Sequence, residues 1–294
     1  MLWIANAELV AAVSNAGAFG IISASAGAQI TTNQVENLRD QIRKAKKLTD
    51  KPFGVNLPIR SASEDLIAVI AEEGVPAVIT AAGNPALYTT RFKQLGIKVL
   101  HLVSSVKQAK SAEAAGVDAV IAKGYEAGGV NGTDELTILV LVPQVADAVK
   151  IPVVASGGIA DARGFVAALA LGAEGVQMGT VFITTNECIA HPSYKEAIVK
   201  AGDTDTIVLG RRTYPRRGLK TDLSLKLLEE ENLHPSEELS FDREAMRSAH
   251  LEGDLNRGVP GCGSVAGMIR EIVGAGTIVQ RIMDGIPDIT RRLQ

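Results

Sequence analysis

The sequence predicts an α/β protein folded as a parallel (β/α)₈ TIM barrel, and three observations predict it. Short apolar runs rich in Val and Ile alternate with longer segments in which Ala, Leu and Ile recur at helical spacing. Most of the short runs are apolar throughout, as expected for strands with helices over one face and a barrel interior on the other. Several helical segments also end in a glycine just before the next strand, as at Gly74, Gly96 and Gly116.

Seven strands are expected, each a short apolar run. They lie at residues 19–22, 53–57, 77–80, 98–103, 119–122, 153–155 and 175–178. Seven strands do not close an eight-stranded barrel, and a helical pattern begins almost directly after Met1. We therefore expect the first barrel strand to be absent from this chain, so that the last two expected strands are the seventh and eighth.

The barrel pattern is interrupted between residues 210 and 260. Two arginine pairs surround Tyr214 and Pro215, and an acidic stretch follows at residues 229–231. This composition is too charged for a barrel strand, and barrel enzymes place substrate covers after the carboxyl ends of their strands. We expect residues 210–260 to form an inserted helical lid, residues 1–209 and 261–294 to form the barrel, and residues 263–273 to form its last helix.

The composition indicates a globular protein of the cytoplasm. Of the 294 residues, 46% are hydrophobic and 21% are charged, which is enough for a full core. A formal net charge of -3 gives no field that would recruit nucleic acid or a membrane surface. Cys188 and Cys262 lack metal-ligand spacing and suit a reducing compartment, so we expect no metal site.

A phosphate cradle is expected after the last two strands. One strand runs into Ser156, Gly157 and Gly158, and the next runs through Gln177 and Met178 into Gly179 and Thr180. Paired glycines let backbone N–H groups approach an anion, and a helix N-terminus favours negative charge. In (β/α)₈ enzymes the loops after strands seven and eight commonly share one phosphate. The alternative is that these glycines only make tight turns.

Polar groups follow other strands at the same rim. Asn56 ends one strand, Gly83 follows the next, and Gln177 lies at the end of the last. An amide both donates and accepts hydrogen bonds, which suits the edge of a flavin or pyrimidine ring, and a loop-capping role is the alternative.

Two titratable residues are candidates for catalysis. Glu126 lies in a glycine-rich loop, residues 123–132, and is either an active-site acid or a cap for the backbone amides that follow. His101 is the histidine at the rim end of a strand, and its alternative role is structural. His250 falls in the lid, where we expect it to be solvated.

Four arginines of the expected lid and one cysteine each have two possible roles. Arg211, Arg212, Arg216 and Arg217 either bind a pyrophosphate or phosphorylated carrier arm or form a solvated face. Cys262 has no base beside it in the sequence, so inert packing is favoured over nucleophilic catalysis.

At these residues the sequence resembles a known family. The segments Glu126-Ala127-Gly128-Gly129, Ala155-Ser156-Gly157-Gly158-Ile159, Gln177-Met178-Gly179-Thr180-Val181-Phe182 and Ala190-His191-Pro192-Ser193-Tyr194-Lys195 occur in the order found in the nitronate monooxygenases and flavin-dependent enoyl-acyl carrier protein reductases. The early segment Lys51-Pro52-Phe53-Gly54-Val55-Asn56-Leu57 is similar as well. The resemblance covers nearly the whole chain.

The resemblance implies non-covalent FMN at the carboxyl-terminal mouth of a barrel. It places the phosphate on Gly157, Gly158, Gly179 and Thr180 and the ring near Asn56 and Gln177, and Gly83, Gly128, Gly129, Ser156 and Met178 complete the expected cofactor site. The implied reaction is oxidation of a nitronate with O₂. The alternative is reduction of an enoyl thioester or quinone with NADH or NADPH as co-substrate, and a homodimer is also expected.

The sequence departs from the family at two places. The family has a strand before the segment that matches residues 1–5, and a barrel without it would expose two sheet edges and bind FMN poorly. A histidine usually follows the Glu-Ala-Gly-Gly segment as base or donor, but Val130 stands there. Valine cannot transfer a proton, so an FMN-binding barrel without the family's catalysis is a further alternative. A flavin-free barrel like the inosine monophosphate dehydrogenases would need a mid-barrel cysteine, and neither cysteine is so placed.

Overall fold

The structure is a computed structural model that describes residues 1–29, 31–234, 239 and 241–293. Its main element is a curled sheet of seven parallel strands. Its order is β1-β2-β3-β4-β5-β7-β8. The strands are β1 (Gly20–Ser23), β2 (Phe53–Pro58), β3 (Ala77–Ala81), β4 (Lys98–Val103), β5 (Ala119–Lys123), β7 (Val153–Ser156) and β8 (Gly175–Gln177). All seven expected strands are confirmed, with no end shifted by more than one residue.

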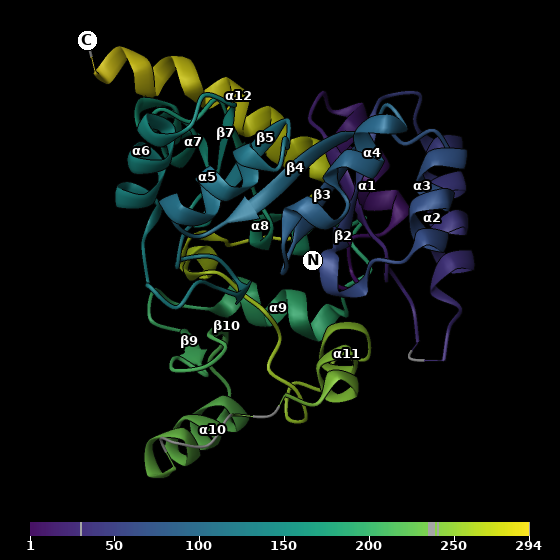
Figure 1. The fold of residues 1–294 in the computed structure, drawn as a ribbon. Helices are drawn as coiled ribbons and strands as arrows, with labels where there is room; N and C mark the ends of the chain where they lie inside the picture. The colour runs from purple at the N-terminus through teal and green to yellow at the C-terminus, as the bar shows by residue number, and fades with distance from the viewer. Residues whose placement is uncertain (30, 235–238, 240, 294) are drawn as a thin grey trace.

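Helices cover the outside of this sheet (Figure 1). They are α1 (Ala7–Asn15), α2 (Gln34–Leu48), α3 (Glu64–Glu72), α4 (Thr89–Gln94), α5 (Val106–Ala114), α6 (Ile138–Ala148), α7 (Ala162–Ala170) and α12 (Ala275–Arg292). Helices α8 (Thr180–Ile183) and α9 (Pro192–Lys200) follow the last strand and pack against the 3-10 helix Ser264–Met268. Several helices begin at a polar side chain that accepts hydrogen bonds from the first turn, as Asn33, Ser63, Ser105 and Asp161 do. Across the described part of the chain, every helix is too short or too polar to cross a membrane.

The two faces of the sheet differ because successive side chains of a strand point to opposite sides. Val55, Val78, Val120 and Ala155 are fully buried in the core between the sheet and the helices. The residues that alternate with these belong to the concave face, which surrounds a cavity described below. The fold class is therefore confirmed as a TIM-barrel type of α/β fold, with seven strands in the sheet.

Helix α12 makes the helical layer continuous where the strand ladder is not. Among the described residues, β1 and β8 are the two sheet edges and do not pair with each other. Helix α12 packs against both α7, which precedes β8, and α1, which precedes β1. Its Ala275, Ile278 and Ile282 are buried in a second core cluster. This helix therefore spans the space between the edges of the sheet.

The segment expected as a helical lid also contains a strand. Strand β10 (Arg216–Leu219) pairs antiparallel with β9 (Thr206–Leu209) and with the short β6 (Gly129–Val130). Helices α10 (Asp222–Leu233) and α11 (Arg243–Leu251) follow, and residues 235–238 and 240 lie outside the described residues. Because β9 precedes residue 210, the small sheet crosses the expected boundary, and the division into barrel and lid stays a prediction.

The prediction of a last helix at residues 263–273 is wrong. A short 3-10 helix, Ser264–Met268, is followed by extended chain, and the last helix is α12. The reason is tertiary: a Cβ at Gly267 would lie 2.8 Å from the Asp203 Cα, and Val273 forms a bridge with Thr185. These close approaches hold the segment out of the helical conformation that its small apolar residues favour.

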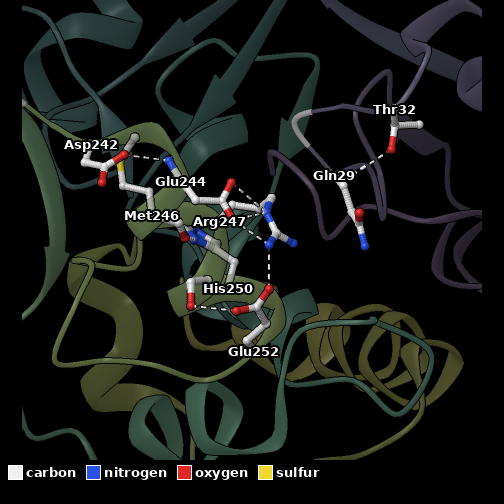
Figure 2. Close-up of polar contacts among 9 residues, drawn as sticks. Gln29, Thr32, Asp242, Glu244, Met246, Arg247, His250 and Glu252 are labelled. Atoms are coloured by element: carbon white, nitrogen blue, oxygen red, sulfur yellow. Dashed lines mark hydrogen bonds and ion pairs between the residues drawn. The ribbon is translucent and has the colours of Figure 1, made fainter.

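Helix α11 is fixed by a polar cluster (Figure 2). The Arg247 guanidinium donates to the carboxylates of Glu244 and Glu252, and the Ser248 hydroxyl donates to Glu252 at 2.9 Å. The prediction that His250 is solvated is wrong. Its ring is buried 5.5 Å from the Trp3 ring, because α11 turns its apolar side to the first residues of the chain.

We predict opposite effects of the same substitution at two glycines of α12. A Cβ at Gly276 would meet only the Ala16 Cβ at 3.8 Å, so Gly276→Ala should raise the free energy of unfolding by about 0.5–1 kcal/mol. A Cβ at Gly285 would lie 2.7 Å from the Ala162 Cβ, so Gly285→Ala should lower it by about 1–3 kcal/mol. Urea unfolding of both variants measures this, and equal shifts would contradict the packing of α12 on α7.

Candidate functional site

One cavity of about 1470 Å³ lies at the carboxyl ends of the seven strands. The loops that follow the strands and the lid elements β10 and α11 surround it. All of the residues expected from the sequence to form the site line this cavity: Asn56, Gly83, His101, Glu126, Gly128, Gly129, Ser156, Gly157, Gly158, Gln177, Met178, Gly179 and Thr180. The parallel sheet brings them together, because all of its strands end at the same rim.

The loops after β7 and β8 form a cradle of backbone donors. Gly157 and Gly158 have φ values of +100° and +70°, in the left-handed region that favours glycine. Among the described residues, no protein acceptor bonds the backbone N–H groups of Gly157, Gly158 or Gly179. A Cβ at Gly157 would lie 3.1 Å from the Ala127 backbone N, so a side chain would crowd the cradle. The arrangement leaves several N–H donors for an anion.

Three loops are tied together beside this cradle. The Gly263 N–H donates to the Thr180 hydroxyl oxygen at 3.0 Å, and the Ser264 N–H donates to the Glu126 carbonyl at 2.9 Å. A Cβ at Gly128 would lie 2.8 Å from the Cys262 carbonyl carbon, so only glycine fits this approach. The loops after β5 and β8 are thus held by the segment that rejoins the barrel.

Two amides reach into the concave side of the sheet from opposite sides of the cavity. The Asn56 amide donates to the Ile79 carbonyl at 3.2 Å, which leaves its oxygen as an acceptor. The Ser156 hydroxyl donates to the Gln177 amide oxygen at 3.2 Å, which leaves the Gln177 NH₂ as a donor. The two amides therefore offer complementary groups to a planar polar ring.

The remaining cofactor residues contribute mainly backbone. Gly83 follows β3 in a turn with Ala82 in the left-handed region, and a Cβ there would clash with the Ile59 side chain. The Met178 side chain packs against both core clusters. Gly129 pairs with Arg217 at the start of the small sheet. Close approach of the chain accounts for Gly83, a φ of +73° accounts for Gly129, and apolar packing accounts for Met178.

Glu126 occupies the position of a helix cap. Both of its carboxylate oxygens accept from the Ile138 N–H, at 3.0 and 3.2 Å, and Ile138 is the first residue of α6. A carboxylate at a helix N-terminus is favoured by the unpaired N–H groups and the helix dipole. Of its two expected roles, the contacts favour the cap.

The His101 side chain lies on the helix side of β4, although the residue is part of the cavity wall. It aligns with Thr80 and Val120 on the neighbouring strands, and Val120 belongs to the core beneath the helices. Its Nδ1 lies 2.8 Å from the Thr80 hydroxyl oxygen. Burial lowers the pKa of His101 to about 4, so the ring is neutral at neutral pH. These contacts favour the structural role over proton transfer.

Lys123 is the titratable residue whose importance the sequence did not reveal. It ends β5 on the concave face, two residues after Ile121, and its Nζ donates to the carbonyls of Val130 and Gly128. Burial, together with the smaller effect of the positive charge of Arg216, lowers its pKa to about 8. The alternation of the strand after Ile121 was the available signal, because it turns Lys123 into the cavity.

Other titratable groups around the cavity are already engaged in the fold. The Tyr194 hydroxyl donates to the Gly261 carbonyl, and burial raises its pKa well above the ordinary value. The His250 Nδ1 bonds the Met246 carbonyl, and burial lowers the pKa of the ring to about 4. Burial raises the pKa of the Cys262 thiol to about 12, so this cysteine is inert as a nucleophile.

The fold and the cavity define a barrel protein whose ligand mouth lies at the carboxyl ends of its strands, with an anion cradle after the last two. The sequence profile of the family "Nitronate monooxygenase" matches residues 1–66 and 60–285. The chain belongs to the nitronate monooxygenase family, a family of oxidoreductases.

The relatives include three kinds of protein. A probable nitronate monooxygenase of Staphylococcus saprophyticus is 38% identical over 269 residues, which cover 76% of this chain and 74% of that protein. A Rhodococcus jostii protein named (3aS,4S,5R,7aS)-5-hydroxy-7a-methyl-1-oxo-octahydro-1H-indene-4-carboxyl-CoA dehydrogenase is 41% identical, over 76% of this chain and 62% of that protein. The structure of FabK from Thermotoga maritima matches with a TM-score of 0.90 and 43% identity, over 100% of this chain and 92% of that one.

We predict that His101 makes the fold sensitive to acid. Its pKa is about 4 in the folded protein and 6.5 otherwise, so between these values the unfolded chain binds the proton that the folded chain does not. Stability should therefore be full above pH 6.5 and fall by on the order of 3 kcal/mol as the pH falls through 4. In His101→Gln this loss of stability between pH 6.5 and 4 should be absent. Urea unfolding at several pH values measures the free energy of unfolding of both proteins. An unchanged slope would contradict the buried neutral ring.

Proposed function

We propose that this protein is an FMN-dependent oxidoreductase that oxidises alkyl nitronates with O₂. The observation that carries the proposal is the set of free N–H donors of Gly157, Gly158 and Gly179 at one end of a cavity of about 1470 Å³. Such a cradle suits a phosphate monoester, and the cavity beyond it is large enough for a ring system. Membership in the nitronate monooxygenase family supports the same assignment.

The residues present fit FMN at both ends of the molecule. Gly157, Gly158 and Gly179 would hold the phosphate with backbone N–H groups, and the Thr180 hydroxyl would donate to it while accepting from Gly263. Asn56 and Gln177 would bond the polar edge of the ring. When bound, the flavin supplies the transfer of electrons between donor and acceptor.

Lys123 is proposed to take the role that Val130 cannot perform. The Lys123 ammonium donates to the Val130 carbonyl in the cavity wall, so the charge lies beside the position where the family has a histidine. An ammonium group there would pair with a nitronate anion, or would donate a proton to the α-carbon of an acyl thioester as it is reduced. Both roles need the protonated amine.

The alternative reaction is reduction of an enoyl thioester or quinone with NADH or NADPH. The likeness to FabK over the full chain favours it, and a family relative named as a CoA-thioester dehydrogenase supports a thioester substrate. A cytoplasmic location is proposed because both cysteines are free thiols. A homodimer stays a prediction.

We predict that the purified protein binds FMN and that charge at position 179 abolishes binding. A Cβ at Gly179 would meet only the Met1 side chain at 3.8 Å, so both Asp and Asn fit there. Gly179→Asp should lose FMN, because its carboxylate would face the phosphate, whereas the isosteric Gly179→Asn should retain most of it. The ratio of flavin to protein from the visible spectrum measures this. Equal FMN content in both variants would refute the phosphate assignment.

We predict that activity falls as the pH rises above about 8, where Lys123 loses its proton. Flavin reduction without air by a nitronate, or by NADH or NADPH, separates the two reactions. In Lys123→Met the rate of the productive reaction should fall by roughly 10²-fold or more, and its dependence on pH near 8 should disappear. Lys123→Arg keeps the positive charge, so it should keep nitronate binding and should show no fall in rate near pH 8. A Lys123→Met profile identical to wild type at equal FMN content would remove Lys123 from the mechanism.

A further inference from the structure

Among the described residues, three arginines of the cavity lining make neither an ion pair nor a hydrogen bond with the protein. Arg60 follows β2, Arg216 lies on β10, and Arg243 begins α11. The carboxylates that line the cavity are those of Glu126 and Asp134, and Glu126 is bound to the N-terminus of α6.

Most of the other arginines are paired, which makes this set distinctive. Arg217, next to Arg216 on β10, donates to the Tyr125 carbonyl and to the Thr206 hydroxyl. Arg211 pairs with Glu135. Of the four lid arginines considered from the sequence, Arg216 is therefore the one that presents an unpaired guanidinium to the cavity, and its companions Arg60 and Arg243 come from distant segments.

Aromatic rings hold these guanidinium groups in place. The Arg216 Cζ lies 5.0 Å from the centre of the Phe241 ring and 6.0 Å from that of Tyr214. The Arg60 Cζ lies 6.0 Å from the same Tyr214 ring, so Tyr214 lies within reach of both cations. Stacking orders a guanidinium but accepts none of its hydrogen bonds strongly, so the N–H groups remain for a ligand.

Arg216 adds positive charge close to that of Lys123. Arg216 is aligned with Val130 across β10 and β6, and the Val130 carbonyl binds the Lys123 ammonium. Arg216 is also half-buried, and burial lowers its pKa, because a cation without a counter-charge is disfavoured there. A bound anion would compensate this charge.

We propose that Arg60 and Arg216, which share the Tyr214 ring, form a subsite for the diphosphate of an adenine-nucleotide arm carried by a substrate, with Arg243 in the wall of the same cavity. Guanidinium groups bind phosphate oxygens in pairs, and two arginines around one aromatic ring suit two adjacent phosphates. The reacting end of such a substrate would extend towards Lys123. The proposal rests on the alternative reaction of the proposed function, since a nitronate and O₂ carry no nucleotide arm, and the reacting end of the arm-bearing substrate must meet the flavin. Coenzyme A thioesters and nicotinamide dinucleotides share this diphosphate.

The test measures binding of ADP to the FMN-loaded protein by calorimetry. Arg60→Gln and Arg216→Gln should each weaken ADP binding about tenfold to a hundredfold, because a hydrogen-bonded ion pair contributes about 1.5–3 kcal/mol. Arg211→Gln removes the same charge from the same lid outside the cavity, and it should bind ADP like the wild type. All variants should keep the same flavin content.

Two further measurements make the result decisive. The KM of NADH, NADPH and an enoyl-CoA in Arg60→Gln, a change at an exposed residue, identifies which substrate carries the arm. A raised KM for either class at unchanged kcat supports the subsite and names its source. No ADP binding by the wild type, or equal binding by all variants, refutes the subsite while a normal flavin content leaves the proposed function standing. A protein without flavin would instead refute the proposed function.

Discussion

The structure depends on one constraint, which is that seven strands run parallel in a curled sheet and so end at the same rim. Each strand alternates its side chains between the helical layer and the concave side. Apolar residues such as Val55 and Val120 pack against the helical layer, and Asn56 and Lys123 lie on the concave side. Groups far apart in the chain, such as Asn56 and Gln177, are therefore collected in one cavity.

Glycine-rich loops at this rim provide backbone N–H donors for an anion. Left-handed Gly157 and Gly158 leave their N–H groups unpaired, while the bonds from Gly263 to Thr180 and from Ser264 to Glu126 hold the neighbouring loops. A cradle of fixed backbone dipoles needs no reorganisation when an anion binds. The same loops explain why Glu126 acts as a cap: its carboxylate stabilises the start of α6 and thereby the loop that carries Gly128 and Gly129.

The charges of the cavity are unbalanced, and this imbalance links the fold to the chemistry. Lys123 and Arg216 are partly removed from water without a carboxylate to neutralise them. Folding therefore places positive charge where a ligand must supply the negative charge. An anionic cofactor, a nitronate and a diphosphate arm are ligands of this kind, which is why the cradle, the lysine and the arginines point to one oxidoreductase site.

The sequence by itself determined the barrel class, all seven strands, the glycine loops at the carboxyl rim and the family, because strand periodicity and glycine geometry are local properties of the chain. It could not reveal Arg60 beside Tyr214, since those residues meet only through the lid. Nor did it show that His101 faces the helices, that His250 is buried against Trp3, or that close approach at Gly267 prevents a helix at residues 263–273. Tertiary packing decided these features, because burial, strand register and the approach of distant backbone segments exist only once the chain is folded.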